Sequence, residues 1–150
     1  MSLFSLHGRK KSQEYPVSGS KEVVKKVNYY SGFMSIEDSE RYNKLVLAAM
    51  HHDIGKEFCK TFQKPSGELD DIAHYYGHEN VSAYMFIMYS SDMCVDTHDI
   101  LYVADLIALH MRLFVREEDR EKSYAKLKQL IGEKEFEDLR LLHKADIEGD

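Results

Sequence analysis

The sequence predicts an all-α protein, a compact irregular bundle of five to six or more helices. Apolar residues recur at spacings of three and four along most of the 150 residues, and sustained alternation of the kind typical of strands is not found. The chain is 43% hydrophobic and has only two prolines and two cysteines, so it is expected to form a core without disulfide or metal staples. Fibrous, collagen-like and disulfide-stapled classes are excluded.

The first two helices are expected in the first third of the chain. Residues 20–30 place three valines on one face, and Ser31-Gly32 ends this helix. A second helix is expected to begin near Ser35 or Asp38 and to run through 51–53, ending at Gly55.

Further along, the sequence predicts a turn at 64–67, because proline and glycine favour the dihedral angles of a turn. Three more helices are expected, at about 77–88, 97–114 and 133–147. The charge-rich segment 117–128 is interpreted as an exposed loop and helix surface. Short connections between these helices are typical of an irregular bundle.

Charge divides the chain into a basic leader, residues 1–19, and a domain at 20–150. Residues 1–28 hold six lysines and arginines against two glutamates, whereas the whole chain has a formal charge of −6. Composition favours a solvated, partly disordered leader, and a phosphate-binding arm is the alternative. The acidic remainder argues against a large nucleic-acid-binding face.

The sequence gives no sign of export or of a membrane partner. Its longest apolar runs, such as 45–50, are far shorter than the roughly 18 residues that cross a bilayer. The basic residues follow the short apolar start instead of preceding it, which reverses the order of a signal peptide. Cys59 and Cys94 lack CxxC spacing, so reduced thiols and a cytoplasmic location are expected.

Several polar residues occupy apolar positions of the predicted helices. His52, His110 and Asp146 each continue an apolar stripe at helical spacing, as does His143, and His78 points inward from a helix start. A single inward histidine is usually a hydrogen-bonded core residue. A buried aspartate, however, needs a partner or a metal, and imidazoles with carboxylates are typical ligands of divalent first-row metals.

Four runs of residues resemble the HD-domain superfamily of metal-dependent phosphohydrolases. They are Ala48-Ala49-Met50-His51-His52-Asp53-Ile54-Gly55-Lys56, Tyr76-Gly77-His78-Glu79-Asn80-Val81-Ser82-Ala83, Leu106-Ile107-Ala108-Leu109-His110 and Lys144-Ala145-Asp146. The second run is especially similar to the HD domains of tRNA nucleotidyltransferases, the CCA-adding enzymes. The resemblance covers residues 20–148 approximately and implies an HD-domain-like bundle.

The resemblance implies a ligand set and a reaction. It makes His52, Asp53 and Asp146 ligands of one metal, and His78 and His110 ligands of a second metal or phosphate contacts. One or two divalent ions (Mn, Fe, Ni, Co, Zn or Mg) are then expected. The implied activity is hydrolysis of a phosphomonoester or phosphodiester of a nucleotide or related small molecule. Asp53 and Lys56 would be the catalytic residues, with Lys56 meeting a phosphate oxygen.

One family ligand, a histidine upstream of the His-Asp pair, has no match on the expected first helix. Three outcomes are left open: His7 folds back, water or a residue such as Asn28 or Glu22 completes the shell, or the site is weakened. The missing histidine supports the main alternative, a degenerate HD module that binds nucleotide, RNA or a partner without turnover. A structural domain that holds tRNA is a second alternative, which the acidic composition disfavours.

The tyrosines and the glutamate near these motifs each allow two interpretations. Tyrosines 75, 76, 84 and 89 can stack on a nucleobase, although such stripes are more often core. Glu79 is either a group that supports His78 or a carboxylate favoured at a helix start. His51 is expected to face away from the ligand set and is left out of it.

Overall fold

The computed structural model describes residues 20–31, 39–92 and 96–149. The predicted leader 1–19, His7, Cys94 and the expected start of the second helix at Ser35 or Asp38 lie outside these residues. Within them the fold is mostly helical, as predicted. A small hairpin is the one addition to the all-α bundle among the described elements.

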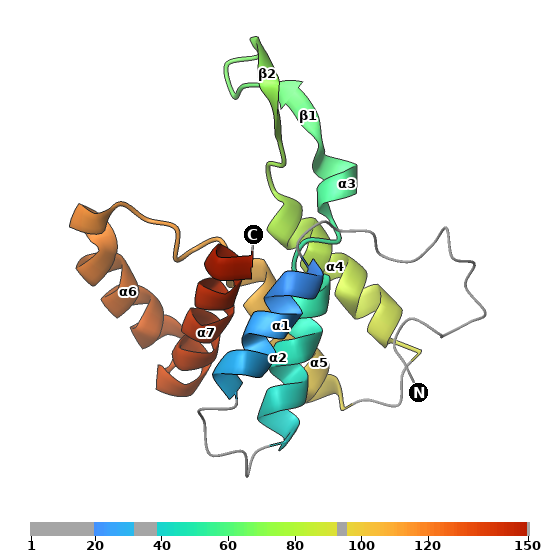
Figure 1. Ribbon diagram of the computed structural model, residues 1–150, viewed down its shortest axis with the longest axis vertical. Coiled ribbons are helices and arrows are strands. Elements are labelled where there is room, and N and C mark those ends of the chain that lie inside the picture. Colours follow the sequence, from blue (N-terminus) through green and yellow to red (C-terminus); the bar gives the residue numbers. More distant parts are fainter. Residues whose placement is uncertain (1–19, 32–38, 93–95, 150) are drawn as a thin grey trace.

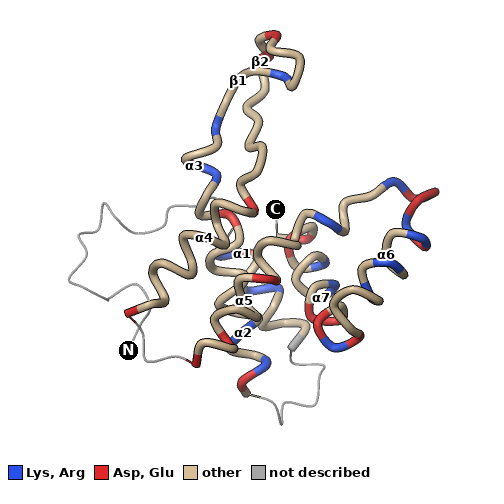
Figure 2. Tube along the Cα trace, turned by 180° about the vertical axis from the view of Figure 1, so that it is seen from behind, with Lys and Arg blue, Asp and Glu red and all other residues tan. Residues whose placement is uncertain are grey.

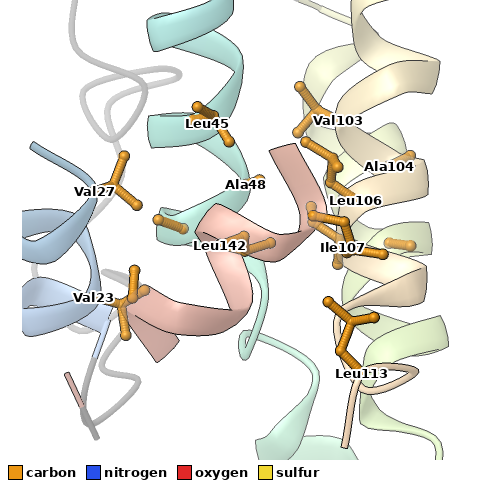
Figure 3. Close-up of a cluster of buried hydrophobic side chains, with 14 of the residues drawn as sticks. Val23, Val27, Leu45, Ala48, Val103, Ala104, Leu106, Ile107, Leu113 and Leu142 are labelled. Carbon is orange, nitrogen blue, oxygen red and sulfur yellow. The ribbon is translucent and has the colours of Figure 1, made fainter. Parts of the chain in front are cut away.

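The helices α1 (Ser20–Ser31), α2 (Ser39–His51), α5 (Thr97–Leu109) and α7 (Glu133–Gly149) form the body of the bundle. Helix α1 packs on α7 and α2, and α2 and α7 both contact α5. Figure 3 shows how valines of α1, Leu45 of α2, Leu142 of α7 and Ile107 of α5 point toward one another. This shared core fixes the relative positions of the elements that carry the polar residues.

Helix α4 (His78–Ser90) packs against α5, and α6 (Glu117–Ile131) lies outside α7 (Figure 1). Residues 117–128, predicted as an exposed loop and helix surface, lie within one continuous helix, and most residues of that helix are exposed. Leu127 is its buried anchor in the core. A helix with one buried apolar residue shows little hydrophobic periodicity, and the sequence therefore predicts this segment as helix only in part.

A hairpin of β1 (Thr61–Gln63) and β2 (Leu69–His74) follows the short helix α3 (Lys56–Cys59). The turn between the strands includes the predicted 64–67 turn, but the strands themselves were not predicted. Figure 1 shows the hairpin projecting from the helical body, with α3 and the start of α4 at its base. The hairpin therefore occupies the interval between the His-Asp pair and His78.

Two helices end earlier than predicted. Helix α2 stops at His51 and residues 52–55 form a turn, because the amide of Gly55 donates to Ser82 Oγ at 2.8 Å, a tertiary bond that replaces continued helical pairing. Helix α5 stops at Leu109 instead of continuing to residue 114, and His110 caps its end. Both corrections place a predicted ligand just beyond a helix.

Candidate metal centre

The turn after α2 carries the two adjacent polar residues of the site. Ile54 N donates to His51 O at 3.3 Å and Lys56 N donates to Asp53 O at 3.0 Å, so the turn is closed by its own backbone. His52 is completely buried and Asp53 is 5% exposed. The prediction that His52 points inward is correct, although it does so from a turn and not from a helical stripe.

The other three predicted ligands arrive from three different helices. His78 is the first residue of α4, and Gly77 before it has φ of 75°, a left-handed conformation that favours glycine. His110 follows the last residue of α5, and Asp146 lies in the last part of α7. All three side chains are buried, as predicted.

The five side chains meet in one place, with Asp53 at the centre. Its Oδ2 lies 3.1 Å from His52 Nε2, and its Oδ1 lies 3.1 Å from His78 Nε2 and 3.7 Å from His110 Nε2. Asp146 Oδ1 lies 3.2 Å from His52 Nε2. One potential ligand atom from each of His52, Asp53 and His110 falls within 4.8 Å of the others, so this buried group can hold a metal ion.

The three imidazoles share an orientation that leaves the same nitrogen for the centre. In each ring Nδ1 lies 2.6–3.0 Å from a backbone carbonyl three residues earlier in the chain. A carbonyl oxygen only accepts, so each Nδ1 carries the proton and each neutral ring has its lone pair on Nε2. The backbone thus fixes the tautomer that metal-binding histidines need.

The charges of the metal-free centre are strongly coupled. Burial alone would lower the pKa of His52, but hydrogen bonds and charge interactions with Asp146 and Asp53 outweigh it and raise the pKa to about 10. For Asp53, burial opposes ionisation, yet bonds from His110, His52 and His78 hold the pKa of its carboxyl well below the usual range. Without metal, therefore, protonated His52 supplies positive charge to the ionised carboxylate.

Lys56 lies at the more exposed side of the centre. Its Nζ is 3.2 Å from Asp53 Oδ2 and 5.5 Å from the centre of the Tyr75 ring, and the side chain is 30% exposed. Glu79 Oε2 is 3.7 Å from His78 Nδ1 while lying in the first turn of α4, so both readings of this residue agree with its position. Lys56 is thus placed to meet an anion that approaches Asp53.

Two residues named for the missing upstream ligand are engaged elsewhere. Glu22 pairs with Lys25 at 3.0 Å on the surface, and Asn28 accepts a hydrogen bond from Tyr42. Neither makes a contact with the centre. Among the described residues, therefore, α1 contributes no ligand, and the question of His7 lies outside them.

Three further residues named from the sequence also have definite positions. His51 is buried with its ring against Phe86 at 5.0 Å, so it is outside the ligand set but does not face solvent. His143, also expected to point inward, is half-buried with its Nδ1 buried, and its ring lies against Phe114 with a centroid distance of 4.5 Å. Asp146, three residues later on α7, is the residue of this helix that reaches the centre.

The tyrosines named for base stacking do not form one surface. Tyr84 on α4 is 64% exposed, and Tyr76 at the base of the hairpin is 50% exposed with its ring stacked on His74. Tyr75 alone is shown beside the centre, through Lys56. Tyr75 therefore lies close to a residue that borders the centre.

Sequence reasoning missed Ser82, which is completely buried and accepts the hydrogen bond of Gly55 N. This contact ties the turn bearing Asp53 to the helix bearing His78. No pattern signals it, because a serine on a helix and a glycine after an aspartate are each common without pairing. Only the packing of α4 on the turn reveals the contact.

Within the described parts of the chain, no helix combines the length and the apolar content that crossing a membrane requires. Comparisons with protein-family models, with curated proteins and with solved structures find no match to the chain. The side chains of the centre are therefore the main evidence on function.

Proposed function

We propose that the protein is a metal-dependent phosphohydrolase that acts on a nucleotide or a related phosphate ester. The observation that carries the proposal is the convergence of three Nε2 atoms and two carboxylates on one buried point. His78 Nε2 and His110 Nε2 lie 3.1 Å apart, and both rings donate Nδ1–H to carbonyls. Two lone pairs at that distance repel unless a proton or a cation lies between them.

The donor set fits one or two divalent ions. Imidazole nitrogens suit zinc, iron, nickel and cobalt, and carboxylates widen the range to manganese and magnesium. His52, Asp53 and Asp146 would hold one ion, and His78 and His110 with the same Asp53 would hold a second. Such an ion supplies a Lewis acid that polarises a phosphoryl oxygen and lowers the pKa of a coordinated water.

The chain's own residues supply the remaining parts of a phosphate-ester site. Lys56 brings a positive charge to the exposed side of Asp53, where it would offset the charge of the bound phosphate. Asp53, central in the cluster, lies 3.1 Å from Nε2 of both His52 and His78 and would fix the position of the attacking water. The resemblance to the HD-domain superfamily supports the same assignment of Asp53 and Lys56.

The test is a hydrolysis screen of the purified chain with p-nitrophenyl phosphate, bis-p-nitrophenyl phosphate and nucleoside phosphates, supplemented in turn with manganese, cobalt, nickel, zinc and magnesium. We expect His52→Gln and Asp53→Asn to remove activity and bound metal while the fold is kept. His74→Gln is the matched control, since His74 pairs with Asp70 at 2.8 Å on the hairpin. Activity that survives both changes at the centre would refute the proposal.

The alternative, a module that binds without turnover, is favoured by one observation. Helix α1 supplies no ligand among the described residues, so the ion held by His52, Asp53 and Asp146 would keep fewer protein ligands than the family pattern implies. Metal content by mass spectrometry separates the two. Bound metal without hydrolysis of any ester in the screen would favour the binding module, and loss of metal in His110→Gln would place the ion at the centre.

A further inference from the structure

A second polar recess lies beside α7, and none of the five residues of the metal centre lines it. It is a groove of about 570 Å³ between α6 and α7 that extends to Tyr30 of α1. Figure 1 shows α6 standing beside α7, and Figure 2 shows basic positions on both helices. The volume is within the range of small-molecule sites, which span roughly 300–1,000 Å³.

The groove is basic although the chain is acidic. Three cations line it, Arg120, Arg140 and Lys144, against two carboxylates, Glu137 and Glu148. Among the described residues neither arginine has a carboxylate within 4.0 Å, whereas Arg116 nearby is paired with two acids of α6. Two guanidinium groups are thus left available to an anion.

The aromatic walls of the groove are held in place by other contacts. The Tyr124 hydroxyl donates to Leu113 O at 3.2 Å, and Lys144 Nζ lies 4.5 Å from the centre of the Tyr30 ring. His143 also lines the groove, and its Nδ1 is buried without a hydrogen-bond partner in the described structure. A ligand that enters therefore meets aromatic rings whose positions are fixed by other contacts.

The position of the groove separates it from the metal centre. Lys144 precedes Asp146 by two residues, which turns it about 200° around the helix. Glu137, Leu141, Lys144 and Glu148 recur at intervals of three and four on this outer face, while Asp146 faces the core. Binding in the groove needs no contact with the five residues of the centre.

We propose that this groove is a second site, which binds a nucleoside phosphate. The two arginines would take phosphate oxygens in charge-assisted hydrogen bonds, and Tyr124 would offer its ring to the base, while the Lys144 ammonium lies over the ring of Tyr30. The volume suits one nucleotide unit and not a strand of several. The site is independent of the proposed hydrolysis and would serve to sense or retain a nucleotide.

The test is an NMR titration of the ¹⁵N-labelled full chain with adenosine 5′-monophosphate in the presence of EDTA, so that metal-dependent binding at the centre does not contribute. We expect shift changes at the amides of Tyr124, Leu141 and Lys144. Affinity should fall at least about fivefold in Arg120→Ser and in Arg140→Ser, and about tenfold when adenosine replaces the nucleotide.

Arg116→Ser is the matched control, because the side chain of Arg116, the residue just before α6, is 79% exposed and does not line the groove. We expect its affinity to stay within about twofold of wild type, and Arg140→Lys to recover part of the loss. Shift changes confined to His52 and His110, or an equal loss in Arg116→Ser, would overturn the proposal. Tight binding of an oligonucleotide with none of the mononucleotide would also overturn it.

Discussion

Replacing Gly55 by alanine tests whether the contact between the turn and α4 positions the metal centre. A Cβ at residue 55 would lie 2.7 Å from His78 O, 2.7 Å from Ser82 N and 2.9 Å from Ser82 Oγ. The φ of Gly55 is −78°, so alanine fits the backbone and only the space is lacking. The turn must therefore withdraw from α4.

The size of the withdrawal follows from those distances. Ordinary contact begins at 3.4 Å, so the turn and α4 must separate by about 0.7 Å. We expect this separation to lengthen the distance between Asp53 Oδ1 and His78 Nε2, which is now 3.1 Å. We expect overpacking to cost about 1–3 kcal/mol of unfolding free energy, and metal affinity to fall by about 10–100-fold, as for other changes to groups that support ligands.

Urea denaturation of the metal-free protein measures the first effect, and competition with a metal-binding dye measures the second. Gly149→Ala is the matched control, since its Cβ would lie 2.8 Å from Val23 N at the contact of α7 with α1, away from the centre. It should lose stability without losing metal affinity in the folded state. Unchanged metal affinity in Gly55→Ala would refute the reasoning.

Three other outcomes are expected. The pKa of His52 is raised from 6.5 to about 10, so the stabilisation from its proton is fully present below pH 6.5 and is lost as the pH rises through 10. In EDTA, therefore, the melting temperature of the wild-type protein should fall between pH 6.5 and pH 10 by more than that of His52→Gln. Burial and then the charge of Asp105 raise the pKa of Glu135 from 4.5 to about 7, so Glu135→Gln should raise the melting temperature at pH 8 and leave it unchanged at pH 4. Asp138→Ala should cost about 3 kcal/mol in urea denaturation, because it removes the buried carboxylate that pairs with Arg41 at 2.5 Å.

Much of the ligand cluster could be predicted because its polar residues interrupt the apolar pattern of the helices that carry them. His110 and Asp146 occupy positions where the helical pattern calls for apolar side chains, and such positions face the core. Burial followed from the pattern, and convergence followed from the cost of isolated buried charge. The distances among the five residues could not follow, since they depend on how four segments pack.

The errors arise where tertiary contacts outweigh local preference. Residues 52–55 read as the end of a helix, but the amide of Gly55 bonds to Ser82, a residue 27 positions away. The hairpin strands, 61–63 and 69–74, are short and mostly exposed on both faces, so they show no alternation. His143 fits the apolar spacing of α7 but is only half-buried, with its ring against Phe114 and its side chain at the edge of the groove.

The pairing of His52 with Asp146 spans 94 residues of sequence, and this separation bears on how the molecule assembles. The turn after α2 supplies two donors by itself, and the rest arrive only when α4, α5 and α7 have docked. If the centre binds a cation as proposed, a partly folded chain would have low affinity for it, and the cation would stabilise only the complete fold. An ion supplied at a thousand times its dissociation constant would add about 4 kcal/mol to the unfolding free energy of the whole chain. Undocking any one of these helices would release the ion, so the helices would then unfold together.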